Sequence, residues 1–252
     1  MSGHSKWSTI KHGKAISDAR RGKLFTKLAR ELIVAAKQGG GDSDANFRLR
    51  IAVQRARDSN MPANNIERAI KRGTGEGGDQ DQMLEAVYEG YGPGGAAILL
   101  ETLTDNRNRT VSEIRSTFAR AGGSMAEAGA VAWQFEQRGV VVVESDEDQA
   151  ESLTLTAIDA GADDFDTVDS TLHVYSSPEA LEGLRGALSE NQAVVRSSET
   201  AMLPKNTIML DSKTALQTLR LLDQLEELDD VQRVFSNADF PDEAMERYQA
   251  EA

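Results

Sequence analysis

Cysteine is absent from the 252-residue sequence, and its absence excludes disulfide bonds, thiolate metal sites and cysteine nucleophiles. It also fits a protein of the reducing cytosol. No apolar run approaches the length of a membrane-spanning helix, so the sequence predicts none. The N-terminus carries charge but lacks the apolar stretch of a secretory signal. Together these observations predict a cytoplasmic protein that does not enter a membrane.

Signatures of catalysis are also missing. The chain contains no nucleophile elbow, no Walker loop and no zinc-protease helix motif. His4 and His12 have no cysteine or carboxylate beside them, so no metal site is expected, and His173 is interpreted as structural. The glycine-rich segment 90–95 precedes a predicted strand, which favours a turn over a nucleotide loop. We predict no enzyme activity and no cofactor. The alternative is an enzyme that acts on nucleic acid, for instance a metal-dependent nuclease that uses His12 or the loop around Asp105.

Charge is distributed very unevenly along the chain. The formal net charge is −13, yet residues 1–72 hold 16 Lys and Arg against 6 acidic residues, for a net charge of +10. Residues 73–252 hold 12 basic against 35 acidic residues, for a net charge of −23. Surface charge can vary between domains without a functional reason, but a contiguous basic block favours a binding site for a polyanion.

Helical periodicity organises the basic block. Residues 1–16 show no sustained periodicity and are predicted to form an extended arm. Three amphipathic helices then predict a small bundle over 17–72, followed by a glycine-rich linker over 73–79. The helices are expected at 18–38, at 47–58, and from a cap at Asn64 or Asn65 to Gly73.

The first of these helices has one basic face. At about 100° per residue, Lys23, Lys27, Arg30 and Lys37 lie opposite the apolar stripe. Glu31 is the only acidic residue between positions 19 and 41. Like charges at these spacings repel, and a face that only keeps a helix soluble usually mixes both signs. A solvated face is the alternative, but we favour contact with phosphate.

Candidate nucleic-acid contacts extend into the arm and the other helices. Trp7 lies among lysines of the arm, where it is expected either to stack on a base or to pin the arm onto the protein. The second helix carries arginines on both flanks of its apolar stripe. The full set is Lys6, Trp7, Lys11, Lys14, Arg20, Arg21, Lys23, Lys27, Arg30, Lys37, Arg48, Arg50, Arg55, Arg57, Lys71 and Arg72.

A secondary phosphate candidate follows a predicted strand. Arg107 and Arg109 lie beside the expected N-terminus of a helix, where N–H groups favour an anion. The alternative is local: Asn108 and Thr110 cap the helix while both arginines bond Asp105. The sequence leaves both interpretations open.

Strands and helices alternate over the rest of the chain. Their order between residues 137 and 200 is β-α-β-β-α-β, which predicts a ferredoxin-like unit. Residues 241–252 are short and polar and are expected to fray. The predicted strands are 84–89, 96–104, 131–136, 140–144, 164–168, 171–175, 193–197, 207–210 and 231–236. The predicted helices are 110–121 with a capping box, 147–160, one that begins at Ser177-Pro178, and 212–228.

These residues closely resemble the YebC family of bacterial regulatory proteins. The motifs include GHSKW at 3–7, RGKLFTKLARE at 21–31, NMPANNIERAIKRGTG at 60–75, YEGYGPGG at 88–95, LTDNRNRTVSEIR at 103–115 and LLDQLEELDDVQRVFSN at 221–237. Members are described as probable transcriptional regulators that bind DNA. Related members, including the mitochondrial translational activator of cytochrome c oxidase, are linked to translation and to relief of ribosomes stalled on proline-rich stretches.

The resemblance implies an α+β fold. It has an N-terminal three-helix bundle and two α/β domains, with the ferredoxin-like one inserted into the other. The expected parts are the arm 1–16, the three-helix domain 17–72, the linker 73–79, a discontinuous α/β domain over 80–136 and 201–240, the inserted domain 137–200 and the tail 241–252.

For the target, we favour ribosomal RNA over a DNA promoter, with DNA binding as a weaker property of the same basic face. Sequence-specific DNA readers usually place one recognition helix in the major groove and repeat it through a dimer. This chain has no clear dimerisation stripe, so a monomer is expected, and its basic residues line a whole helix face. The acidic remainder is expected to project away from the RNA, toward a functional centre or a partner such as the ribosome.

Overall fold

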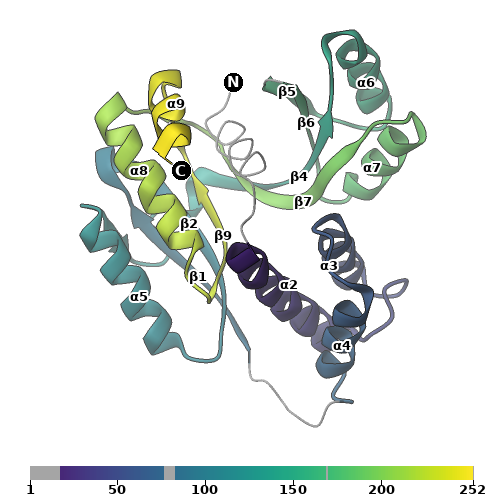
Figure 1. The fold of residues 1–252 in the computed structure, drawn as a ribbon, viewed down its shortest axis with the longest axis horizontal. Helices are drawn as coiled ribbons and strands as arrows, with labels where there is room; N and C mark the ends of the chain where they lie inside the picture. Colours follow the sequence, from purple (N-terminus) through teal and green to yellow (C-terminus); the bar gives the residue numbers. More distant parts are fainter. Residues whose placement is uncertain (1–17, 77–82, 169, 252) are drawn as a thin grey trace. The chain divides into compact units, whose positions relative to one another are not determined.

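The computed structural model describes residues 18–76, 83–168 and 170–251. The described residues of Ala15–Ala86 and Thr102–Arg107 form one compact unit, which we call the helical unit. Those of Val87–Glu101 and Asn108–Ala252 form a second one, the sheet unit. Figure 1 shows that the fold mixes helices with antiparallel sheets, as the sequence predicts.

Three helices lie in the helical unit (Figure 1), and their buried side chains share one apolar core. They are α2 (Asp18–Gly39), α3 (Phe47–Asp58) and α4 (Ala63–Gly73). Leu32, Leu49 and Ala56 are completely buried in this core. The first two helices lie where the apolar periodicity predicts them, because each buries a single stripe of small and branched side chains.

The start of α4 differs from the prediction. Pro62 occupies the cap position without a side-chain hydrogen bond, and Asn64 and Asn65 lie inside the first turn. The predicted Asn cap is therefore wrong, because proline already restricts the chain at the helix entry. Gly73 ends the helix where α4 meets α2: a Cβ there would lie 2.5 Å from the Ile33 carbonyl oxygen.

Asn46 joins α2 to α3. Its side-chain amide donates to the carbonyl oxygens of Ala35 at 2.8 Å and Gly40 at 2.9 Å. Its side-chain oxygen accepts from the Leu49 N–H at 3.1 Å and so caps α3. Gly39 is required beside it, since a Cβ there would lie 2.6 Å from the Asn46 amide nitrogen. One buried side chain thus fixes the end of one basic helix and the start of the next.

The first sheet has the strand order β3-β1-β2-β9. Its elements are β1 (Leu84–Tyr91), the 3-10 turn η1 (Pro93–Gly95), β2 (Ala97–Thr104), α5 (Arg107–Arg120), β3 (Ser124–Ala126), α8 (Ser212–Glu226), β9 (Val231–Ser236) and α9 (Asp242–Glu251). Ile98 and Leu100 of β2 pack with Phe118 of α5, Leu219 of α8 and Phe240 in the principal core. Segment 90–95 connects β1 to β2 through a turn, which confirms that part of the sequence analysis.

The second sheet has the order β5-β6-β4-β7, and each neighbouring pair is antiparallel. Its elements are β4 (Phe135–Glu144), α6 (Glu147–Asp159), β5 (Asp164–Val168), β6 (Thr171–Ser176), α7 (Leu181–Glu190) and β7 (Val195–Pro204). A further core joins the two sheets of this unit, with Leu99 and Phe235 from the first and Phe135 and Val140 from the second.

Only residues 135 and 136 of the predicted strand 131–136 form a strand, and they are continuous with the predicted strand 140–144. The short turn η2 (Ala132–Gln134) precedes β4, which then runs without interruption through Gly139. A Cβ at Gly139 would lie 2.7 Å from the Ser176 hydroxyl, so this glycine permits close approach of β6 and does not mark a turn. The domain boundaries predicted between residues 136 and 137 and between residues 200 and 201 fall inside the paired strands β4 and β7.

The expected frayed tail is wrong. Residues Asp242–Glu251 form α9, whose Ala244, Met245 and Tyr248 are buried in the principal core. Their spacing of one, three and four residues gives this short helix an apolar side. A small parallel pair, β8 (Ile208–Met209) with β10 (Ala238–Asp239), lies before α8 and α9 in the chain. Among the described helices, none is both long and apolar enough to cross a membrane.

Candidate nucleic-acid interface

The described N-terminal candidates lie on α2, α3 and α4. Lys6, Trp7, Lys11 and Lys14 of the arm fall outside the described residues, and so does the side chain of Arg20. The predicted linker 73–79 is described only as far as residue 76. The interface can therefore be built from the three helices alone.

Helix α2 separates cationic from apolar side chains. Arg21, Lys23 and Lys37 are exposed, and Lys27 and Arg30 are half-buried. The apolar side of the same helix is buried in the helical core through Leu28, Leu32, Ile33, Ala35 and Ala36. A helix of this kind presents several positive charges to solvent without a matching number of acids.

Arg55 of α3 has a partner within the protein. Its Nη1 donates to Glu31 Oε2 of α2 at 2.9 Å, and both side chains are largely shielded from water. Because this pair joins two helices, Arg55 contributes to helix packing. Its role as a phosphate contact stays a prediction.

Arg48 and Arg50 also bond within the helical unit. Arg50 donates to the backbone carbonyl oxygens of Ser43 and Asp44 at 3.2 and 3.1 Å, and its guanidinium lies 5.7 Å from the centre of the Phe47 ring. Arg48 forms an exposed ion pair of 2.6 Å with Glu85. Exposed pairs of this kind contribute little to stability, so Arg48 can exchange Glu85 for another anion at low cost. Arg50, in contrast, braces the loop before α3.

Helix α4 carries a cationic cluster. Lys71 and Arg72 are exposed near its C-terminus, as expected for predicted contacts. Arg68 is exposed as well, three and four residues before them, and so shares their helix face. The sequence reasoning did not select Arg68, although its spacing to Lys71 and Arg72 was a sufficient signal. Ile66 and Ala69 bury the opposite side of the helix.

The secondary candidate Arg109 is engaged with a distant carboxylate. Its guanidinium donates to both oxygens of Asp230 at 3.0 and 2.8 Å, and the Thr110 hydroxyl donates to the same group at 2.8 Å. Asp230 is 2% exposed, so the arginine compensates a buried charge. Helix α5 begins at Arg107, before Thr110, and the predicted capping box does not form. Arg107 is exposed, and its phosphate role stays a prediction.

Two family sequence models match the chain. Residues 5–76 match the sequence model of the TACO1/YebC protein N-terminal domain, and residues 83–238 match that of the TACO1/YebC second and third domain. The chain belongs to the TACO1/YebC family.

Full-length relatives share about half of the residues. A probable transcriptional regulatory protein of Dehalococcoides mccartyi is 53% identical over 252 residues, which is 100% of both chains. One from Geobacter sulfurreducens is 51% identical and covers 98% of this chain and 99% of its own. The crystal structure of a conserved hypothetical protein from Aquifex aeolicus, 43% identical, matches with a TM-score of 0.84 and covers 92% of this chain and 96% of its own.

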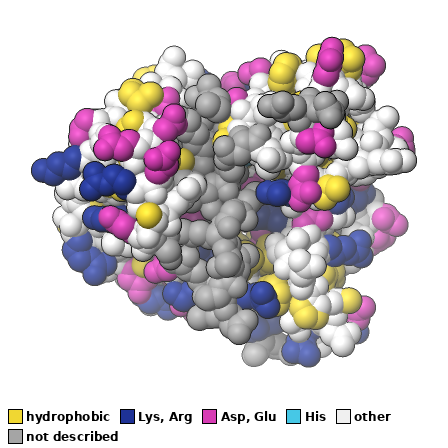
Figure 2. Space-filling view, turned by 45° about the horizontal axis from the view of Figure 1, so that its top comes forward, with side chains coloured by type: hydrophobic (Ala, Val, Ile, Leu, Met, Phe, Trp, Pro, Cys, Tyr) yellow, Lys and Arg dark blue, Asp and Glu magenta, His cyan; other side chains and the backbone are white. Residues whose placement is uncertain are grey.

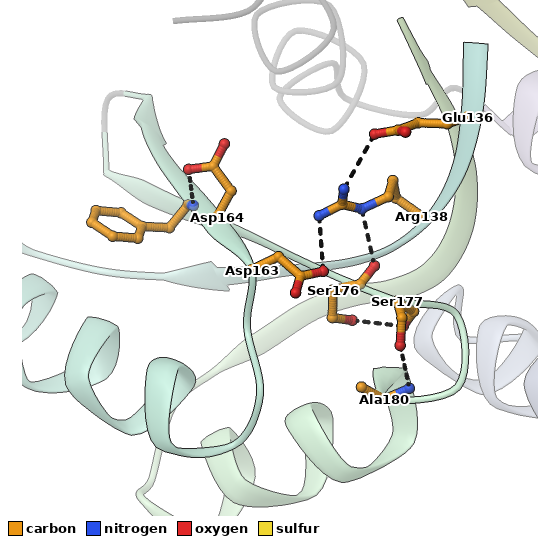
Figure 3. A network of polar contacts seen from close by, with 8 residues as sticks. Glu136, Arg138, Asp163, Asp164, Ser176, Ser177 and Ala180 are labelled. Carbon is orange, nitrogen blue, oxygen red and sulfur yellow. Dashed lines mark hydrogen bonds and ion pairs between the residues drawn. The ribbon is translucent and has the colours of Figure 1, made fainter. Parts of the chain in front are cut away.

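In the second sheet of this TACO1/YebC chain, acidic side chains bind an arginine of the same sheet. In Figure 3, Arg138 of β4 points between two acids, with Nη1 3.2 Å from Glu136 and Nη2 2.9 Å from Asp163. Its Nε donates to the Ser176 carbonyl oxygen at 3.3 Å. Figure 2 shows acidic and hydrophobic side chains intermixed at its upper right. Within the described ranges, no group of three or more His, Asp and Glu is arranged to hold a metal ion.

Proposed function

We propose that this chain is a nucleic-acid-binding regulator of gene expression that acts by binding and not by catalysis. The observation that carries the proposal is the concentration of exposed and half-buried cations on α2 and α4, most of them opposite the side chains that form the helical core. The contacts proposed on these two helices are Arg21, Lys23, Lys27, Arg30, Lys37, Arg68, Lys71 and Arg72. The names of the relatives, probable transcriptional regulatory proteins, agree with a regulatory role.

Phosphate is the chemistry that suits this surface. Lysine and arginine replace the counterions that condense on a nucleic-acid backbone, and their release favours binding regardless of base sequence. The described cations of α2 lie along the helix over several turns and do not cluster at one N-terminus. That distribution is suited to following a backbone and is less suited to reading base edges in a major groove.

Ribosomal RNA is the main target that we propose. The contrast between the net charge of +10 over residues 1–72 and −23 over residues 73–252 favours attachment through one end. The family resemblance adds a role in translation, namely relief of ribosomes that stall on proline-rich stretches. DNA binding would then be a weaker property of the same surface.

The remaining parts have proposed roles in this scheme. We assign residues 17–72 as the binding domain and residues 80–136 with 201–240 as a discontinuous α/β domain. The strand order β5-β6-β4-β7, together with α6 and α7, supports a ferredoxin-like assignment for residues 137–200. This acidic part would reach a functional centre of the ribosome or a protein partner.

Crosslinking in cells, followed by sequencing of the bound DNA and RNA, tests the proposal. We expect recovery of ribosomal RNA and sedimentation with ribosomes, and we expect both to fall strongly in the variant K23A/K27A/R30A. Enrichment at promoters without a ribosomal signal would replace the ribosomal target by a DNA target. Metal-dependent cleavage by the pure protein that is lost on His12→Ala would replace binding by a nuclease activity.

A further inference from the structure

Trp133 is the most exposed large hydrophobic side chain among the described residues. It is 67% exposed and lies in η2, directly before β4. The sequence analysis placed it in a strand, where alternate side chains would be buried. An indole left in water on a folded surface is unusual, and it needs a reason that packing does not give.

The loop that carries Trp133 is held by a buried carboxylate. Glu89 of β1 is 5% exposed, and its oxygens accept the N–H groups of Gly129 and Val131 at 2.6 Å and of Ala132 at 2.9 Å. Burial opposes the negative charge, but these three donors outweigh it, and the pKa of Glu89 is lowered. Three donors on one carboxylate fix the backbone immediately before the tryptophan.

The polar atoms of the neighbouring aromatic rings turn toward the protein. The indole N–H of Trp133 donates to the Ala130 carbonyl oxygen at 3.1 Å, and the Tyr91 hydroxyl donates to the same oxygen at 3.2 Å. Lys205 is exposed and donates from Nζ to the Trp133 carbonyl oxygen at 2.9 Å. We call Tyr91, Trp133 and Lys205 the aromatic platform. What it offers to a ligand is ring surface and one positive charge.

We propose that the aromatic platform stacks an unpaired nucleobase on Trp133 while Lys205 faces the attached phosphate. The indole needs no hydrogen-bond partner from the ligand, because Ala130 already accepts its N–H. Every base has a π-face that can stack, and the rigid loop lowers the entropy lost on binding. This site goes beyond the proposed function, since it lies in the sheet unit and binds single strands.

A nucleotide fits these observations better than an apolar protein surface. The residues that follow the platform in the chain are all exposed: Asn206 and Thr207 are polar, whereas Ile208 and Met209 are apolar. The choice of a nucleotide therefore rests on the positive charge of Lys205, and an apolar protein surface is the alternative outcome of the test. Lys205, which binds the backbone carbonyl oxygen of Trp133, supplies a positive charge that complements a phosphate. Glu127 is exposed on the same loop, and its negative charge should weaken the binding of a phosphate. Its removal should therefore have the opposite effect to the removal of Lys205.

The experiment uses the full chain with Trp7→Phe, so that Trp133 is the sole tryptophan, and with K23A/K27A/R30A to weaken the basic surface. A short single-stranded oligouridine is titrated while tryptophan emission is recorded, and fluorescence anisotropy of a labelled oligonucleotide gives the affinity. We expect quenching by the single strand and none by a duplex of equal length. Trp133→Ala should weaken binding about 5- to 150-fold, the range found when a stacking ring is removed.

Three further variants separate stacking from nonspecific attraction. Lys205→Ala should weaken binding and lower the salt slope by about one. Glu127→Gln should tighten binding, because it removes a negative charge near the phosphate. Glu89→Gln should weaken binding, because the loop that carries Trp133 becomes less ordered. Unchanged affinity of folded Trp133→Ala, equal quenching by duplex, or quenching by a proline-rich peptide and not by oligouridine would each overturn the proposal. Because the background already weakens α2, none of these outcomes bears on the basic surface.

Discussion

Glu31 of α2 and Arg55 of α3 form an ion pair across the helical unit, with 2.9 Å between Oε2 and Nη1. Glu31 is the only acidic residue between positions 19 and 41, and here it serves an arginine of the neighbouring helix. Glu31 is thus committed to packing α3, whatever further contacts it makes. Two arginines of α3 therefore differ: Arg55 binds the neighbouring helix, whereas Arg57 is exposed.

Arg55→Ala should destabilise the protein, while Arg57→Ala should not. Removing Arg55 leaves the Glu31 carboxylate shielded from water without this partner, and we expect a loss of about 1–2 kcal/mol in the free energy of unfolding. Arg57 is exposed on the same helix, and its removal should change stability by less than about 0.5 kcal/mol. Urea unfolding followed by helical circular dichroism measures both. Equal losses in the two variants would contradict the distinction.

The charge of α2 should determine the salt dependence of binding. In K23A/K27A/R30A, the slope of log affinity against log salt should fall by about three, one for each phosphate contact removed. Affinity should drop by a similar factor for unrelated sequences, because no base edge is read. Titrations of RNA and DNA at several salt concentrations give the slope.

A matched control for that variant removes three exposed cations from the sheet unit, as R115A/K213A/R247A. It changes the net charge by the same amount without touching α2. We expect its salt slope to stay close to that of the unchanged protein. An equal fall of the slope in both variants would assign binding to net charge and not to the α2 surface.

Asn46→Asp should destabilise the helical unit more than its small change in shape suggests. An aspartate can still accept the Leu49 N–H, but it loses both donors to Ala35 and Gly40 and turns a negative charge toward their carbonyl oxygens. We expect a loss of about 2–3 kcal/mol. Asp44→Asn, an exposed position in the same loop, serves as the control in thermal melts. Equal melting temperatures for the two variants would show that the buried amide contributes no stability.

Glu89 should make stability depend on pH below the usual range of glutamate. Its pKa in the folded protein is lowered from 4.5, because the N–H donors of Gly129, Val131 and Ala132 outweigh burial. The stabilisation is therefore fully present above pH 4.5 and is lost as the pH falls through the lowered pKa. Glu89→Gln should be less stable at neutral pH, by roughly 1–3 kcal/mol. Unfolding monitored by Trp133 fluorescence in a Trp7→Phe background should show this difference shrinking in acid, and a constant difference would contradict the assignment.

Local signals were enough to predict much of the fold. The bounds of α3 and of β9 follow from periodicity and flanking residues, since each is a short element with a distinct apolar side. The continuity of β4 through residues 137–139 was not predicted, because the close approach of β6 that requires Gly139 is not visible in the sequence. Helix α9 was missed because its apolar residues are few and its partners lie far away in the chain.

The sequence was sufficient to predict which segments of the candidate site are positively charged, but not which acidic residue each arginine binds. Clusters of cations are visible in sequence, and those of α2 emerge on the side away from the core. The partner of Arg109 is Asp230, which is 121 residues away, and no spacing rule connects them. The exposure of Trp133 likewise depends on Glu89, a residue of another strand.

The continuous pairing of β4 with β7 has a mechanical consequence. Their register runs from Phe135 opposite Pro204 to Val143 opposite Val195, with one irregularity between Val142 and Val143. A two-stranded ribbon of this length is stiffer than a single-chain linker, because backbone hydrogen bonds keep its two strands from moving independently. The segment that carries α6 and α7 is thus held at the end of a stiff two-stranded ribbon. A force or a partner applied at that end would be transmitted to the first sheet, and it would not be absorbed at a hinge.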